Sequence, residues 1–190
     1  MAKTMVDRLS ALAGHYKTGH FGIAGQTGVT MTEVTNLCMA QIACWPDTLV
    51  AVGRQAAEMA GCDAAPKPGH ATDGSNGSLL RIEPLKWWLF GAEATELDAE
   101  QGNTLDISHS RTHLRITGDE ATTLLNRHLP IDLREDSFPV GSVASTAYHH
   151  VGVTLWRSEQ GYELFLPRGF AVSLWEGLLE SAEQFGVEVV

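Results

Sequence analysis

Apolar residues in the first half of the chain form short runs with the length and spacing expected of strands. Residues 29–34 alternate between apolar and polar, and residues 38–45 form a longer apolar run, so both are predicted strands. A helix is expected next, with Asp47 as its N-cap and Gly61 at its end, because apolar positions recur between them at helical spacing.

Irregular sequence surrounds the next predicted strands. A stretch rich in Pro, Gly and Ser over residues 62–77 predicts a loop, and residues 79–82 and 87–90 predict two buried strands. The acidic stretch at 93–103 predicts an exposed connection. Residues 1–28 show little periodicity and are interpreted as a loosely ordered arm.

The second half begins with a clearly alternating strand at 111–117, in which Leu114 and Ile116 are expected to face inward. A short helix should start at Gly118 and end at Pro130, because proline cannot continue a helix. The remaining predicted elements are strands at 143–156 and 162–166, an amphipathic helix over 167–185 and an edge strand at 187–190.

Both halves therefore repeat the order strand, helix, connection, strand. This repetition predicts an α+β fold in which two half-units pack about a shared core. We expect one α+β domain over residues 29–190, made of half-units 29–104 and 105–190.

Net charge narrows the classes of partner. With 13 basic and 23 acidic residues the formal net charge is −10, so nucleic acid and anionic membrane surfaces are unfavourable partners. No run approaches the ~20 apolar residues of a membrane helix, and the N-terminus lacks the apolar stretch of a secretory signal. Three cysteines at spacings of no known motif predict reduced thiols. We therefore expect a cytoplasmic protein.

The sequence contains no complete catalytic set. His109 and His113 are four residues apart, but such residues on a strand lie roughly 13 Å from each other and cannot share one metal ion. The G-x-S-x-G elbow, the P-loop and the dinucleotide fingerprint are all missing. We therefore predict that this chain has no catalytic, cofactor-binding or metal-binding residues.

Two features predict contacts with a ligand or partner. Arg111, His113 and Arg115 fall on the outward face of one strand, which suits an acidic partner or a carboxylate-bearing ligand. The alternative is a solvated face balanced by nearby acids. Trp87 and Trp88 should face opposite sides of their strand, so one of them is expected to be partly exposed or covered by a partner.

Two stretches of the second half resemble a known family. The sequence LDISHSRTHLRITGDEATTLLNRHLPIDL at 105–133, read with YELFLPRGFAVSLWEGLLE at 162–180, is similar to the gamma subunit of bacterial heterotetrameric sarcosine oxidase. The resemblance extends more loosely to W-W-L-F-G at 87–91. That family is similar in turn to the folate-binding fold of glycine-cleavage aminomethyltransferase. The aminomethyltransferase pattern D-x-S-H…G-x-x-A-x-x-L corresponds here to Asp106, Ser108, His109, Gly118, Ala121 and Leu124.

The resemblance implies an α+β fold with ferredoxin-like halves and membership of a four-subunit flavoenzyme. In that enzyme sarcosine is oxidatively demethylated to glycine, tetrahydrofolate takes the one-carbon unit, and oxygen gives hydrogen peroxide. The family implies FAD, FMN and NAD on the large subunits, zinc on the delta subunit and no cofactor on gamma. This chain is therefore expected to be a structural subunit that assembles with alpha, beta and delta subunits.

The aminomethyltransferase pattern is incomplete here. The strand that carries acidic residues in aminomethyltransferases corresponds to YHHVGVTLW at 148–156, which has no acid. Two alternatives to the structural subunit remain. One is a stand-alone folate-binding or aminomethyl-transfer-like protein with ligand contacts from Arg111, Arg115 or His109. The other is the same subunit in a complex that acts on another N-methylated amino acid.

Overall fold

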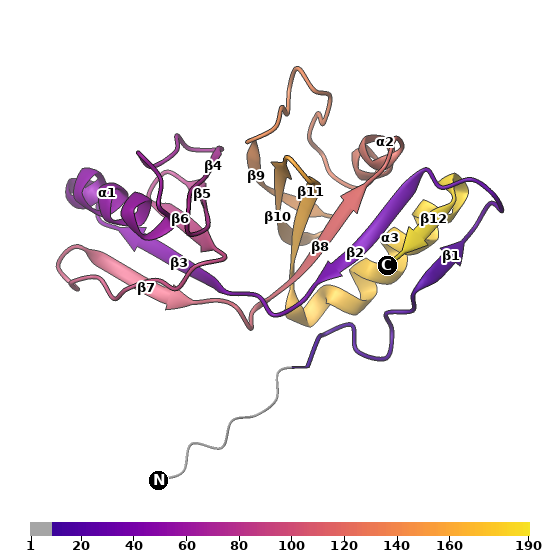
Figure 1. Ribbon diagram of the computed structural model, residues 1–190, viewed down its shortest axis with the longest axis horizontal. Coiled ribbons are helices and arrows are strands. Elements are labelled where there is room, and N and C mark those ends of the chain that lie inside the picture. The colour runs from indigo at the N-terminus through magenta and orange to yellow at the C-terminus, as the bar shows by residue number, and fades with distance from the viewer. Residues whose placement is uncertain (1–8) are drawn as a thin grey trace, which may run out of the picture.

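A computed structural model describes residues 9–190 and contains two sheets, of seven and five strands, that lie side by side (Figure 1). In spatial order the larger sheet consists of β1 (Gly19–Phe21), β12 (Val187–Val189), β2 (Val29–Val34), β8 (Arg111–Thr117), β11 (Gly161–Pro167), β10 (Val151–Ser158) and β9 (Val143–Tyr148). The smaller sheet consists of β4 (Ala71–Asp73), β5 (Ser78–Glu83), β6 (Lys86–Phe90), β3 (Met39–Cys44) and β7 (Gly102–Asp106).

Helices cover one face of each sheet. The helices and 3-10 turns are η1 (Pro46–Thr48), α1 (Leu49–Ala60), α2 (Ala121–Asn126), η2 (Arg168–Phe170), α3 (Ala171–Ala182) and η3 (Glu183–Phe185). Helix α1 packs on the five-stranded sheet, whereas α2 and α3 pack on the seven-stranded sheet. All strand pairs are antiparallel except β12 with β2. The predicted α+β class is confirmed.

The faces without helices pack against each other. Trp88 and Leu80 from the five-stranded sheet meet Phe165 and Trp156 from the seven-stranded sheet in a shared apolar cluster. The two sheets are also joined through their backbones, since the N–H of Val143 donates to the carbonyl of Gly69 at 2.8 Å. The central strands β6 and β11 are therefore buried on both faces, by helix on one side and by the second sheet on the other.

The chain crosses between the sheets twice, and this divides it differently from the half-units 29–104 and 105–190. Strand β2 belongs to the first expected half, but it pairs with β8 and β12 in the seven-stranded sheet. The five-stranded sheet is thus inserted between β2 and β8, which are neighbours in space. Local periodicity contains no information about this pairing because it joins distant segments.

The N-terminal arm is more ordered than predicted. Residues 1–8 lie outside the described residues. Within 9–28, Leu12 is fully buried, Tyr16 packs with its ring centroid 5.1 Å from that of Trp175, and β1 pairs with β12. The prediction of a loose arm was wrong for this part, because its few apolar residues anchor it without forming a periodic pattern. As a consequence β12 lies between β1 and β2 and is not the predicted edge strand.

Of the two predicted ends of the first helix, the C-terminal one was correct and the N-terminal one was not. Gly61 closes α1 in the left-handed conformation, with φ of 72° and its N–H donating to the carbonyls of Ala57 and Glu58. Asp47 is not the N-cap. It lies inside η1, which Pro46 opens, and the Thr48 hydroxyl instead accepts from the N–H of Trp45 at 3.1 Å.

The helix after β8 is shorter than predicted. Helix α2 ends at Asn126, before Pro130, and the side chain of Asn126 accepts from the N–H of Leu133 at 3.2 Å. That contact secures the chain as it turns away from the helix. In residues 9–190 no helix has the length and apolar character needed to cross a membrane.

Candidate functional site

The face of β8 that was predicted to be exposed is largely buried. The side chain of His113 is 0% exposed and that of Arg115 is 30% exposed. The His113 ring stacks on Phe165 at 4.4 Å between centroids, and Phe90 of the other sheet meets it edge-on at 5.3 Å. The prediction of an outward basic stripe was wrong here because the five-stranded sheet covers this face.

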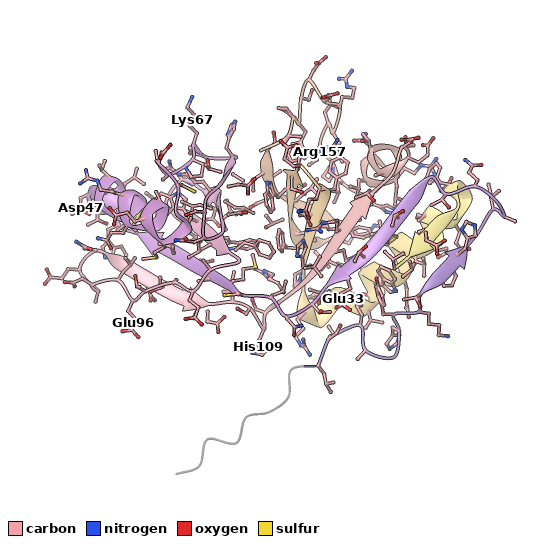
Figure 2. All side chains as sticks on the ribbon, in the orientation of Figure 1. Glu33, Asp47, Lys67, Glu96, His109 and Arg157 are labelled. Atoms are coloured by element: carbon pink, nitrogen blue, oxygen red, sulfur yellow. The ribbon has the colours of Figure 1, made fainter. Side chains whose placement is uncertain are left out.

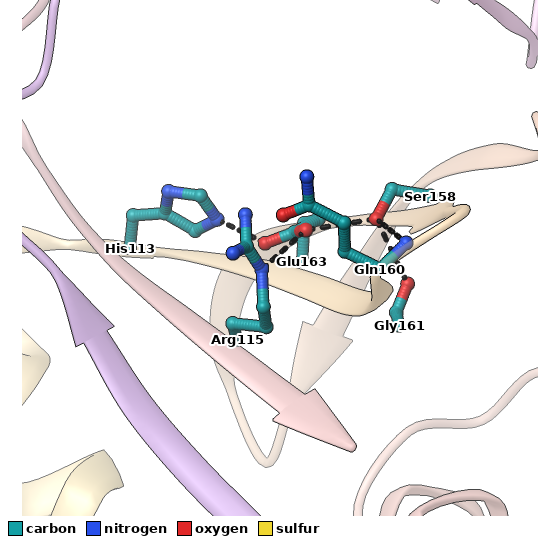
Figure 3. Close-up of polar contacts among 6 residues, drawn as sticks. All are labelled: His113, Arg115, Ser158, Gln160, Gly161 and Glu163. Carbon is teal, nitrogen blue, oxygen red and sulfur yellow. Dashed lines mark hydrogen bonds and ion pairs between the residues drawn. The ribbon is translucent and has the colours of Figure 1, made fainter. Parts of the chain in front are cut away.

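A buried carboxylate organises the polar groups of this face (Figure 3). Glu163 on β11 is 1% exposed and accepts from His113 Nε2 at 2.6 Å and from Arg115 Nε at 2.8 Å. The Ser158 hydroxyl donates to the same carboxylate at 2.8 Å. Three donors thus compensate for the cost of burying one negative charge. We call His113, Arg115, Ser158 and Glu163 the Glu163 cluster.

Burial shifts both titratable members of the central pair. Burial lowers the pKa of His113 from its ordinary value and outweighs the opposite effect of Glu163. Burial alone raises the pKa of Glu163, but the donors from His113, Ser158 and Arg115 prevail and hold that pKa below its usual range. The favoured state is a neutral imidazole that donates Nε2–H to an ionised carboxylate, which leaves Nδ1 as an acceptor.

Trp87 and Trp88 face opposite sides of β6, as predicted, but both are buried. Trp87 packs under α1 and Trp88 packs between the sheets, with exposures of 1% and 2%. The expectation that one of them is partly exposed was wrong, because helix and sheet cover both faces of the strand. Each indole lies beneath a guanidinium, that of Arg81 for Trp87 and that of Arg111 for Trp88.

Arg111 lines a pocket of about 110 Å³ at the crossover between the sheets. The pocket is open to solvent on one side and is lined by residues 9–11, by the chain from residue 33 to 37, by the first residues of β8 and by Arg168. The Arg111 guanidinium lies 5.2 Å from the Trp88 ring centroid, and its buried Nε has no hydrogen-bond partner among residues 9–190. Burial lowers the pKa of Arg111. We call this cavity the crossover pocket.

The D-x-S-H residues of the aminomethyltransferase pattern hold the crossover together. Asp106 accepts from the N–H of Ser108 at 2.8 Å. The Ser108 hydroxyl accepts from the N–H of Met39 at 2.8 Å and donates to its carbonyl at 3.1 Å. His109 follows on the exposed turn near the crossover (Figure 2). These bonds give Asp106 and Ser108 a structural role.

Gly118 of the same pattern is required by close backbone approach. Its φ is 107°, and a Cβ at this position would lie 2.4 Å from the carbonyl oxygen of Gly28. A side chain would therefore push β8 away from the segment that leads into β2. Ala121 and Leu124, which complete the pattern, lie in the core under the seven-stranded sheet.

The structure thus brings Arg111, His113 and Trp88 together but places Trp87 and His109 elsewhere. Sequence reasoning missed Glu163, Ser158 and Arg168. A signal for Glu163 was present, because one acid interrupts the apolar strand YELFLP. Across residues 9–190, His, Cys, Asp and Glu side chains form no group of three or more suited to a metal ion. The absence of cofactor-binding residues stays a prediction.

Comparison with known proteins confirms the resemblance to sarcosine oxidase subunit gamma. The protein of that name from an Arthrobacter species is 32% identical over 92 residues, covering 48% of this chain and 45% of that protein. The one from Corynebacterium sp. strain U-96 is 26% identical over 177 residues, covering 88% of this chain and 86% of that protein. The one from strain P-1 is 28% identical and covers 60% of both. The first alignment thus spans less than half of its relative.

Solved structures share the fold. A chain of the heterotetrameric sarcosine oxidase from Corynebacterium sp. U-96, solved with pyrrole 2-carboxylate, has a TM-score of 0.77 at 25% identity, covering 94% of this chain and 96% of that one. Aminomethyltransferase T from Bartonella henselae has a TM-score of 0.61 at 17% identity, covering 87% of this chain and 48% of that one. The family model described as the GCVT N-terminal domain matches residues 88–190. Because that match spans more than half of the residues of this chain, the chain belongs to the GCVT N-terminal domain family.

Proposed function

We propose that this chain is the gamma-type subunit of a four-subunit sarcosine oxidase and has a structural role without an active site of its own. The observation that carries this proposal is the extent of the structural match. The chain aligns with 96% of one chain from a heterotetrameric sarcosine oxidase, at a TM-score of 0.77. Three curated relatives named sarcosine oxidase subunit gamma support the same assignment.

The partners under this proposal are the alpha, beta and delta subunits. They would hold FAD, FMN, NAD and zinc, and the assembly would oxidise sarcosine to glycine, pass the one-carbon unit to tetrahydrofolate and form hydrogen peroxide. The Glu163 cluster fits a structural role for this chain, because its buried carboxylate is fully engaged by the chain's own side chains. The Glu163 carboxylate stabilises the buried face of β8, and at 1% exposure it is out of reach of a substrate.

Exposed apolar side chains offer a surface for assembly. Trp45, Val50 and Leu105 are each at least half exposed. Trp45 follows β3, Val50 lies on α1 and Leu105 lies on β7, the outer strand of the five-stranded sheet. Covering large apolar residues, tryptophan above all, is the usual source of binding energy at a subunit interface. We expect the five-stranded part of the molecule to contact a large subunit.

The test is purification of the tagged full-length chain from its native cells, followed by gel filtration with detection of flavin absorbance. Co-elution with larger flavin-containing subunits that produce hydrogen peroxide from sarcosine would support the proposal. A colourless chain that elutes alone would contradict it. Fully active, flavin-loaded large subunits from cells that lack this chain would contradict its structural role.

A pair of variants locates the interface. Replacing Trp45 and Leu105 together with serine should weaken co-purification strongly, because loss of one buried tryptophan costs about 2 kcal/mol or more at an interface. Val140→Ser is the matched control, since Val140 is also half exposed but belongs to the seven-stranded part. Equal recovery of the partners with both proteins would place the interface elsewhere.

A further inference from the structure

We propose that four acidic residues beside β7 form the docking surface for a basic face of a partner subunit. These residues are Glu93, Glu96, Asp98 and Glu100, and we call them the acidic segment. Attraction to their carboxylates guides the partner onto the apolar side chains next to them. This assignment rests on the proposed function and deepens it, because it states the charge that the partner must present.

The fold leaves all four residues of the acidic segment exposed to solvent. Ala92 and Leu97, which lie before and within the segment, pack instead against the apolar core under α1. Two hydrogen bonds fix this part of the chain against β7, since the Thr104 hydroxyl accepts from the N–H of Leu97 at 3.3 Å and donates to the carbonyl of Thr95 at 3.2 Å. Figure 2 shows Glu96 projecting outward on this side of β7. The charges are therefore presented from an anchored part of the chain.

Within the part of the chain that the structure describes, no base forms an ion pair with the acidic segment. Residues 87–110 contain five acids and no lysine or arginine. The bases that flank this range are engaged elsewhere, because Lys86 pairs with Glu83 and Arg111 lies over Trp88. A row of like charges without counter-charges repels itself, so a basic surface gains electrostatic energy by docking here.

Each end of the acidic segment lies beside an exposed apolar side chain. Glu93 and Glu96 line an open groove of about 460 Å³ together with Leu105, which is 55% exposed. At the other end the carbonyl of Ala99, which lies between the last two acids, accepts from the indole N–H of Trp45 at 3.3 Å. Trp45 is itself 53% exposed. Because interfaces combine an apolar centre with a polar rim, this arrangement fits a partner face whose apolar centre has a basic rim.

Association rates at two salt concentrations test this assignment. The large subunits are purified from cells that lack this chain and are immobilised, and the full-length chain is bound to them in biolayer interferometry at about 0.05 M and about 0.5 M NaCl. We expect the association rate to be at least about tenfold higher at the lower concentration, as electrostatic steering predicts. A rate that is the same at both concentrations would overturn the assignment.

Charge reversal locates the steering on the acidic segment. Glu96→Lys combined with Glu100→Lys should lower the association rate at low salt at least about tenfold and remove most of its salt dependence, while the dissociation rate changes little. The matched control combines Glu159→Lys with Glu180→Lys, which are exposed in the seven-stranded part and change the net charge equally. We expect the control to keep most of the association rate. Equal losses in both double variants, or no loss in the first, would overturn the assignment.

Failure of this assignment and failure of the proposed function give different results. Large subunits that bind the chain at the same rate at both salt concentrations leave the assembly intact and overturn only the basic partner face. Large subunits that do not bind at either concentration contradict the assembly and the assignment together. If the large subunits are insoluble without this chain, co-expression of each double variant with them, followed by tag purification at both salt concentrations, gives the same comparison.

Discussion

Two arginines on one face of β8 have opposite surroundings. Arg115 donates to Glu163, which His113 and Ser158 also contact, so every charge at this end of the strand is matched. Arg111, four residues earlier, lies over Trp88 with no ion pair among residues 9–190. The Glu163 cluster balances its buried charge, whereas the buried part of the Arg111 guanidinium remains without an ion pair at some cost in stability.

Removing the Glu163 carboxylate should cause the largest loss of stability of all the changes proposed here. Glu163→Ala leaves His113, Arg115 and Ser158 without their acceptor, and we expect a loss of about 3–5 kcal/mol in the free energy of unfolding. Urea denaturation followed by fluorescence measures it. Glu159→Ala is the matched control, because Glu159 is exposed on the neighbouring turn. Similar losses for both variants would show that the cluster contributes little.

The two arginines can be compared directly by the same substitution. Arg115→Met should destabilise by about 1–3 kcal/mol, because it removes a donor from a buried carboxylate. Arg111→Met should be neutral or slightly stabilising, because it replaces an unpaired, half-buried charge with an apolar chain of similar length. Denaturation midpoints of both variants, measured in parallel, test the contrast. If Arg111→Met lost more stability than Arg115→Met, our interpretation of the two arginines would be wrong.

Acid should weaken the fold in two successive ranges of pH. The pKa of His113 is lowered in the folded state, so below its ordinary value of about 6.5 the unfolded chain binds a proton that the folded chain does not. Stability therefore falls with decreasing pH from about 6.5, by at most ~1.4 kcal/mol per pH unit for this one group. The pKa of Glu163 is also lowered, so a second loss begins below about 4.5 and continues until Glu163 is protonated.

Substituting the histidine separates the two ranges. In His113→Gln the loss that begins near pH 6.5 should become smaller, because glutamine does not titrate, and the remainder should come from His128, whose pKa is also lowered by burial. The loss that begins near pH 4.5 should remain, because glutamine can still donate to Glu163. Denaturation measured at several pH values gives both slopes. An unchanged slope near pH 6 in the variant would show that another group is responsible.

Local sequence patterns predicted where strands and helices lie better than they predicted what packs against them. The alternation at 111–117 identified β8 and its inward Leu114 and Ile116, because alternation reflects the sheet face on which each residue lies. It could not reveal that the other face meets a second sheet. That contact depends on Phe90 and Phe165, which come from distant segments of the chain.

The candidate site was predicted only in part, for a related reason. Arg111 was chosen as a carboxylate contact from its charge and strand position, and the structure places it in a pocket. Glu33 on β2 and Arg168 in η2 line the same pocket from distant parts of the chain, so no spacing along the chain links them to Arg111. Glu163 lies 48 to 50 residues from its basic partners, and the one available signal, an acid within an apolar strand, was not used.

The insertion of the five-stranded sheet between β2 and β8 has a consequence for the order of folding. Pairing Val34 with His113 in an unfolded chain means closing a loop of roughly 80 residues. Once the inserted sheet has formed, Ser108 holds Met39 at 2.8 Å, and the ends of that loop are already together. Closing only the few residues that remain saves ~2 kcal/mol of chain entropy. We expect the inserted sheet to form early and to template the β2–β8 pairing.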